Sequence, residues 1–226
     1  MKMRFLVLAA GLVSVPALVA AQQTALPSST AAQAPADEGL TGSVSDENEW
    51  QDLGIAIPAF PTNASVATAA EGGNTEALGR NVARVVFNDL RNNGLFKPVG
   101  PDQLPAVAFP QVAAPTFDTW RGRSAEMLVQ GFVKANDDGK LTVGCYLYDV
   151  ALGSELARQG YVVKPDEWRR AAHKCADMVY SRLSGENPFF DSRIAYIAET
   201  GPKDRRMKRL AIMDSDGANH RYLTTG

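Results

Sequence analysis

Short runs of alternating apolar and polar residues close the chain. Ser192–Ala198 and Arg209–Asp216 alternate with the period of two that is typical of strands, and a polar, basic connection joins them. The second run leads into the turn sequence Asp-Ser-Asp-Gly-Ala-Asn and then Arg221–Leu223. This pattern predicts the inner hairpin of a β-propeller blade at 191–226. Because the chain stops at Gly226, we expect this first blade to be truncated.

Further upstream, apolar segments predict five strands and two amphipathic helices. The predicted strands are Leu53–Phe60, Leu95–Val99, Glu126–Lys134, Lys140–Val150 and Glu155–Val163, with a weaker edge strand at Leu40–Ser45. One helix is predicted over Asn74–Asn93, and a second starts at Pro165 and ends at Gly185. The order of these elements predicts a mixed α/β domain over 39–190, in which a small mixed β-sheet is packed by two amphipathic helices.

The first residues have the pattern of an export signal. Lys2 and Arg4 precede the apolar run Phe5–Val19, and small residues follow it. We therefore predict a cleaved signal peptide over 1–21 and a periplasmic protein with no transmembrane segment in the mature chain. The next segment, 22–38, is rich in Ala, Gln, Ser, Thr and Pro and has no aromatic residue, which predicts a disordered tail.

Composition adds two constraints. The net charge of −2 gives no global field that would favour nucleic acid, and 45% hydrophobic residues suit a globular core. The two cysteines, Cys145 and Cys175, both fall on predicted apolar faces, so in an oxidising compartment they could form a disulfide. The pattern leaves open two buried free thiols as the alternative. A bridge would stabilise the fold by roughly 3–4 kcal/mol in the chain-entropy model.

Signals for catalysis are weak. His173 and Asp177 are four residues apart on the second helix, so their side chains can meet. An acid–base pair would also need a pocket and a partner nucleophile, so the spacing favours a helix-surface hydrogen bond. The two cysteines and two histidines lack metal-ligand spacing, and the sequence has no G-x-S-x-G motif. We therefore predict no catalytic, cofactor-binding or metal-binding residues.

Two further segments could bind anions, and in both the pattern favours a solvated loop. Glu71–Asn74 is glycine-rich and precedes a helix, but it lacks the phosphate-loop motifs. The basic residues of the terminal hairpin connection have no aromatic residues between them. These basic residues are Lys203, Arg205, Arg206, Lys208 and Arg209.

Four segments, in order and at compatible spacing, resemble one protein family. They are IAIPAF at Ile55–Phe60, NDLRNNGLFKPV at Asn88–Val99, WRRAAHKCADMVYSRLSG at Trp168–Gly185 and SRIAYIAET at Ser192–Thr200. Together they resemble the TolB family of the Tol-Pal envelope system. The resemblance implies an amino-terminal α/β domain followed by a six-bladed propeller, of which only the first blade would begin here.

The resemblance also implies a non-enzymatic role in protein–protein interactions. In this family the propeller holds the lipoprotein Pal, and the mature amino-terminal segment engages the inner-membrane protein TolA. The system supports outer-membrane integrity and constriction during cell division. The candidate TolA-binding residues are therefore Gln22, Gln23, Thr24, Ala25 and Leu26. The alternative is a serine peptidase with a propeller cap that has been cut short before its hydrolase domain.

Overall fold

The computed structural model describes residues 53–123 and 125–225. The predicted signal peptide (1–21), tail (22–38) and edge strand (Leu40–Ser45) lie outside the described residues. The elements, in chain order, are β1 (Leu53–Ala56), α1 (Thr75–Asn92), β2 (Phe96–Val99), the 3-10 helix η1 (Phe109–Val112), α2 (Asp118–Arg121), β3 (Met127–Ala135), β4 (Leu141–Asp149), β5 (Ser154–Val163), the 3-10 helix η2 (Pro165–Glu167), α3 (Trp168–Ser184), β6 (Arg193–Thr200), β7 (Met207–Asp214) and β8 (Arg221–Tyr222).

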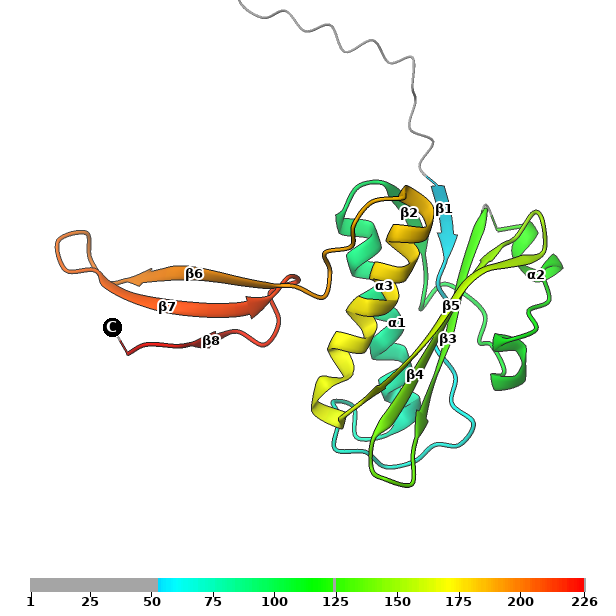
Figure 1. Ribbon diagram of the computed structural model, residues 1–226, viewed down its shortest axis with the longest axis horizontal. Coiled ribbons are helices and arrows are strands. Elements are labelled where there is room, and N and C mark those ends of the chain that lie inside the picture. Colours follow the sequence, from blue (N-terminus) through cyan, green and yellow to red (C-terminus); the bar gives the residue numbers. More distant parts are fainter. Residues whose placement is uncertain (1–52, 124, 226) are drawn as a thin grey trace, which may run out of the picture. The chain divides into compact units, whose positions relative to one another are not determined.

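The first five strands form one mixed sheet in the order β2-β1-β3-β4-β5 (Figure 1). β1 pairs in parallel with both β2 and β3. The parallel β1–β2 pair is possible because α1 forms the crossover between these two strands. β3, β4 and β5 form an antiparallel meander. The turn between β3 and β4 ends at Gly139, whose φ of +79° is strained for any residue with a side chain. The parallel and antiparallel pairs together confirm the predicted mixed sheet.

The first strand is shorter than predicted. β1 ends at Ala56, whereas the apolar run continues to Phe60. Its pairing with β3 covers only Ile55 and Ala56, so the ladder that would extend the strand is absent after that point. Ile57 still donates a backbone hydrogen bond to Val99 O, and Phe60 packs into the core. Burial, rather than strand pairing, accounts for the apolar character of this segment.

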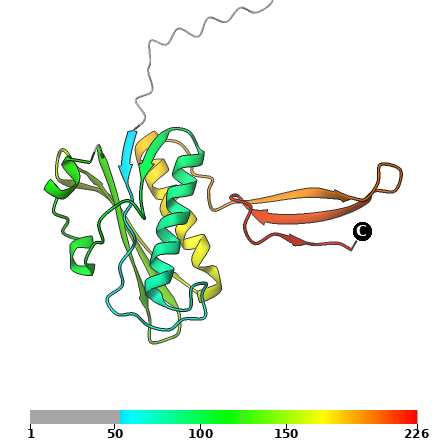
Figure 2. The same cartoon turned by 180° about the vertical axis from the view of Figure 1, so that it is seen from behind.

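Both long helices lie along the same face of the sheet (Figures 1 and 2). Asn74 caps α1 as predicted, since its Oδ1 accepts a hydrogen bond of 2.8 Å from Ala77 N. The second helix begins differently from the prediction, because residues from Pro165 form a 3-10 turn before α3 starts. Gly185 ends α3 in the left-handed conformation, with φ of +76°.

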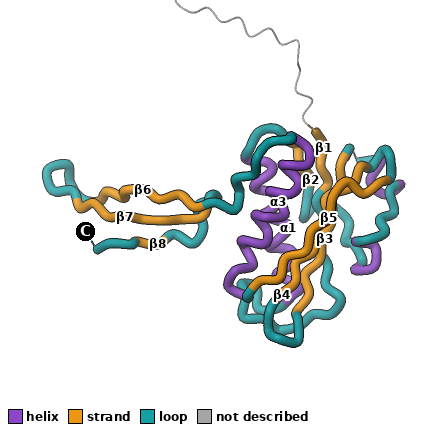
Figure 3. The backbone as a smooth tube through the Cα atoms, in the orientation of Figure 1, coloured by secondary structure: helices purple, strands orange, loops and turns teal. Residues whose placement is uncertain are grey.

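The core lies between these helices and the sheet. It includes the inward face of β4 that the alternation predicts, namely Leu141, Val143, Cys145 and Leu147, all at most 1% exposed. Each large apolar side chain buried there contributes about 1.5–3 kcal/mol to folding. The segment after β2 covers part of the other face of the sheet (Figure 3). A smaller apolar cluster lies there, and Trp120 is buried in it. There Tyr148 donates a hydrogen bond of 2.8 Å from its hydroxyl to Val112 O.

The terminal strands form a separate three-stranded antiparallel sheet in the order β6-β7-β8. The β6–β7 hairpin agrees with the alternation of the sequence. The tight turn between β7 and β8 contains Gly217 at φ of +85°. Within the described residues, no helix has both the length and the hydropathy that crossing a bilayer requires.

Candidate functional site

A buried histidine on α3 is the centre of a polar cluster that joins separate elements of the fold. His173 is 1% exposed, and its Nδ1 lies 2.7 Å from Oδ2 of Asp89, a buried residue of α1. An ionised carboxylate can only accept, so the ring N–H donates this hydrogen bond. The pair therefore links the two helices through a polar contact within an otherwise apolar layer.

The other side of the ring faces the turn between β7 and β8. His173 Nε2 lies 3.8 Å from Oδ2 of Asp216, whose side chain is 12% exposed. Arg169, one turn earlier on α3, donates to the same carboxylate through Nε at 3.0 Å and also through Nη2. The cluster thus joins α1, α3 and the β7–β8 turn.

The charges of the cluster shift the pKa values of its members. Burial opposes the charge on His173 most strongly, but the hydrogen bond to Asp89 and the charges of Asp89 and Asp216 outweigh it and raise the pKa of His173 above 6.5. Burial raises the pKa of Asp89 above 3.8. Burial also acts to raise the pKa of Asp216, but hydrogen bonds from Arg169 and the Ala218 backbone, with the charge of Arg169, bring it below 3.8.

The same three residues offer potential metal ligands. One atom each from Asp89, His173 and Asp216 lie within 4.8 Å of one another. However, Asp89 already accepts from Nδ1, and a cation at Nε2 would lie beside the guanidinium of Arg169 that binds Asp216. The positive charge of Arg169 would repel such a cation. The arrangement therefore fits an ion-pair network better than a metal centre.

The histidine does not form the contact suggested by its spacing with Asp177. Asp177 instead accepts backbone hydrogen bonds from Phe190 at 2.7 Å and Asp191 at 3.2 Å. Burial raises the pKa of Asp177 despite these two bonds. Its carboxylate therefore anchors the segment that leads from α3 to β6, and His173 pairs with Asp89 instead.

Replacing Asp177 with alanine is expected to lower the free energy of unfolding by about 1–3 kcal/mol, because two backbone N–H groups lose their acceptor. Urea denaturation followed by circular dichroism measures this change. Asp137→Ala is the matched control, since Asp137 is exposed in the β3–β4 turn. Equal stability of the two variants would show that the anchor contributes nothing.

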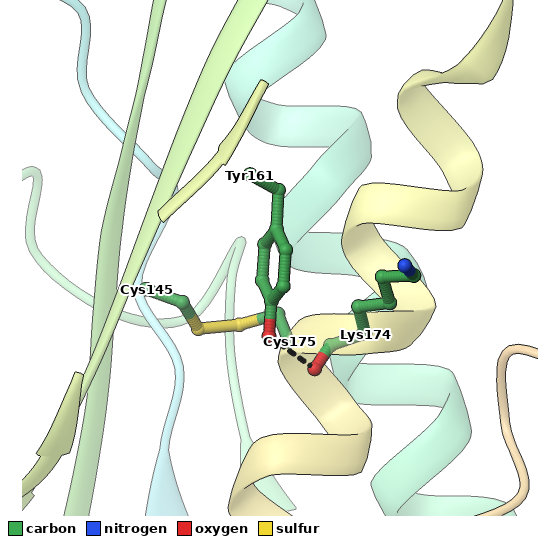
Figure 4. Close-up of a disulfide and its surroundings, with 4 residues drawn as sticks. All are labelled: Cys145, Tyr161, Lys174 and Cys175. Atoms are coloured by element: carbon green, nitrogen blue, oxygen red, sulfur yellow. Dashed lines mark hydrogen bonds between the residues drawn. A yellow bond between two sulfur atoms is a disulfide. The ribbon is translucent and has the colours of Figure 1, made fainter. Parts of the chain in front are cut away.

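The two cysteines meet between the sheet and the helix. The structure joins Cys145 of β4 to Cys175 of α3 as a disulfide, with Cα atoms 5.9 Å apart (Figure 4). Beside it, Tyr161 of β5 donates a hydrogen bond of 2.9 Å from its hydroxyl to Lys174 O. Both links tie α3 to the antiparallel part of the sheet.

The basic residues at the β6–β7 connection are partly neutralised by their neighbours, and two of them, Lys208 and Arg209, lie in β7 rather than in the connection. Glu199 accepts from Arg206 at 2.7 Å and pairs with Lys208 at 2.9 Å. Arg209 lies over the ring of Tyr222, 3.7 Å from its centroid. These contacts support the prediction of a solvated hairpin connection rather than an anion site.

Sequence reasoning missed the Asp89–His173–Asp216 cluster. Asp89 and His173 are 84 residues apart, so no local spacing could pair them. The available signal was the position of the histidine between Ala172 and Cys175, in the apolar stripe of the helix. The candidate tail residues, Gln22 to Leu26, lie outside the described residues.

Comparisons with known proteins agree with the fold. A family model described as the TolB amino-terminal domain matches residues 46–156. The chain is 71% identical over 193 residues to "Tol-Pal system protein TolB 1" of Novosphingobium aromaticivorans, an alignment that covers 85% of this chain and 43% of that protein. This chain belongs to the TolB family. A second TolB relative, from Sphingopyxis alaskensis, is 55% identical over 221 residues, covering 98% of this chain and 47% of the relative.

A solved TolB structure has the same architecture. The crystal structure of TolB from Acinetobacter baumannii superposes with a TM-score of 0.58 at 26% identity, covering 77% of this chain and 39% of that one. The mixed α/β fold and the resemblance to TolB are therefore confirmed. The chain spans less than half the length of these TolB proteins.

Proposed function

We propose that this TolB-family chain serves the Tol-Pal system as a non-enzymatic periplasmic protein that acts through protein–protein contacts. The observation that carries the proposal is the 71% identity over 193 residues with a Tol-Pal system protein. The proposed role is to maintain outer-membrane integrity and to support constriction during cell division.

We propose one role for each of the predicted segments of the chain. After removal of the signal peptide at 1–21, the tail at 22–38 binds TolA, with Gln22 to Leu26 as its first contacts. The α/β domain at 39–190 carries the tail, and the blade at 191–226 belongs to the propeller that binds Pal. The composition of the tail supports this role, since a polar segment without aromatic residues can order on contact with a partner.

Capture of the purified protein by the immobilised periplasmic domain of TolA tests the tail. Deletion of residues 22–38 is expected to weaken capture at least about tenfold, which corresponds to a loss of about 1.4 kcal/mol of binding free energy. The control is a variant that carries the same 17 residues of 22–38 in scrambled order. It keeps the composition and length of the tail and should bind as weakly as the deletion.

Undiminished capture after the deletion would exclude the tail as the TolA site. Equal binding of the scrambled and native tails would show that composition, rather than a specific sequence, is recognised. Replacing Gln22 to Leu26 by glycine and serine then distinguishes the first contacts from the remainder of the tail.

A further inference from the structure

Residues from three separate parts of the chain converge on one buried imidazole. Asp89 comes from α1, His173 and Arg169 from α3, and Asp216 from the turn between β7 and β8. The two ring nitrogens face the two carboxylates, at 2.7 Å on the Nδ1 side and 3.8 Å on the Nε2 side. Among the described residues, the buried Nε2 has no hydrogen-bond partner. Burying a polar atom without a hydrogen-bond partner lowers the stability of the folded state. The loss is smaller when the atom carries a proton and a negatively charged acceptor lies nearby.

We propose that His173 is a protonation-dependent latch, which in its charged form holds the β7–β8 turn against α1 and α3 through Asp216 and Asp89. In the charged form both ring nitrogens carry a proton. Nδ1–H then donates to Asp89, and Nε2–H points toward the carboxylate of Asp216.

The charge balance of the cluster favours this form. With His173 protonated, two positive groups, His173 and Arg169, face two negative groups, Asp89 and Asp216. With His173 neutral, Nε2 becomes an acceptor that faces a second acceptor, the carboxylate of Asp216. The buried group would then have a lone pair directed at a negative charge, and the turn would lose its link to α1.

Another titratable group of α3, Asp177, lies close to His173 and already has hydrogen-bond partners. Asp177 lies one turn further along α3 and is occupied by the backbone N–H groups of Phe190 and Asp191. A cavity of about 210 Å³ borders the cluster and is lined by Asp89, Asp216 and other residues of this junction.

Two other tethers of the turn do not depend on the histidine. Arg169 of α3 keeps its hydrogen bonds to the carboxylate of Asp216 when His173 is neutral. Ser215 donates from its hydroxyl to Phe190 O at 2.6 Å and from its backbone N–H to Ser192 O at 3.2 Å. Loss of the proton from His173 therefore loosens the turn but does not release it. The expected change is in local opening of the turn rather than in global unfolding.

The direction of the pH dependence follows from the pKa shifts of the cluster. The pKa of His173 is raised above 6.5. Its contribution to the stability of the folded turn is therefore complete below pH 6.5, and it is lost as the pH rises through the raised value. Because the pKa of Asp216 is lowered below 3.8, its contribution is present above pH 3.8 and is lost as the pH falls through the lowered value. The charged pair also needs ionised Asp89, whose pKa burial raises above 3.8, so on acidification Asp89 is protonated before Asp216. The latch is therefore closed below the raised pKa of His173 and above the raised pKa of Asp89.

Nuclear magnetic resonance of the purified protein tests the latch, because the chain has only two histidines. His220→Gln leaves His173 as the one imidazole of the chain. We expect its ring to titrate above pH 6.5, and we expect the protection factors of the Ser215 and Gly217 amides to fall about fivefold over the same pH range. Protection factors are used because they remove the intrinsic pH dependence of amide exchange.

Two variants should move the pKa of His173 in opposite directions. Asp216→Asn removes a negative charge, so it should lower that pKa and abolish the pH dependence of the turn. Arg169→Gln removes a positive charge, so it should raise the pKa of His173. Asp204→Asn, in the exposed connection between β6 and β7, is the matched control. It should change neither the pKa of His173 nor the pH dependence of amide protection in the β7–β8 turn.

His173→Gln provides a readout that does not require a titration. In this variant, the protection factors of the Ser215 and Gly217 amides should equal, at every pH, the values that the unaltered protein shows at high pH. The proposal is overturned if His173 titrates while the turn amides keep constant protection, or if the ring stays neutral from pH 4 to pH 9. A pKa of His173 that is unchanged in Asp216→Asn would also overturn it.

Discussion

Replacing Gly79 with alanine is expected to lower the free energy of unfolding by about 3 kcal/mol, because α1 would be driven away from the end of the first apolar segment. A Cβ at this position would lie 2.0 Å from the backbone oxygen of Phe60 and 3.1 Å from its carbonyl carbon. Both are backbone atoms, so no side-chain rotation relieves the clash. Phe60 has little room to retreat, since its ring already packs against Gly131.

The sign of this effect is opposite to the one that helix propensity alone would give. In an exposed helix, alanine is favoured over glycine by about 1 kcal/mol. At Gly79 we expect packing to prevail over that preference. Urea denaturation followed by circular dichroism measures the difference, with Gly160→Ala as the control, because nothing lies within 4 Å of a Cβ built at Gly160. A Gly79→Ala protein as stable as the parent would contradict the close approach of α1 to Phe60.

Replacing both Cys145 and Cys175 with alanine is expected to lower the free energy of unfolding by about 3–4 kcal/mol. The two residues are 30 positions apart, and the bridge between them limits the conformations of the unfolded chain. It also fixes α3 to β4 on the face that carries the core. The loss should be visible as a lower midpoint of urea denaturation under non-reducing conditions.

Reduction of the unaltered protein is the control for this prediction. Treatment with a thiol reductant should lower the midpoint of the parent and leave that of the double alanine variant unchanged. Thiol counting on denatured, unreduced protein should find no free thiol. Two free thiols, or a midpoint of the parent that is insensitive to reductant, would show that Cys145 and Cys175 are not bridged in the protein.

Much of the fold could be predicted from the sequence because its signals are local. The period-two alternation of Leu141, Val143, Cys145 and Leu147 predicts one face of β4, and all four side chains are buried there. Asn74 and Gly185 mark the start of α1 and the end of α3 through backbone geometry that involves only their neighbours. The predicted end of β1 was wrong, because strand length depends on the partner strands and not on the apolar run alone.

The candidate site was harder to predict because its members are far apart along the chain. The sequence pairs His173 with Asp177 on helical spacing, whereas the packing of α1 against α3 brings Asp89 to the ring. Asp216 was assigned to a tight turn by its local sequence, and nothing in that turn indicates that it faces Arg169 and His173. Pairing between distant residues depends on the helix–helix contact and on the position of the turn.

By itself, the sequence determined the elements of this protein, the faces they bury and the family to which it belongs, because periodicity, caps and motifs are properties of neighbouring residues. Only the tertiary structure decided which polar side chains meet. The charge network of Asp89, His173 and Asp216, the role of Asp177 as an anchor and the close approach at Gly79 all depend on how separate elements pack. The physical reason is that a buried charge or a backbone clash is set by distances through space, which the order of residues does not contain.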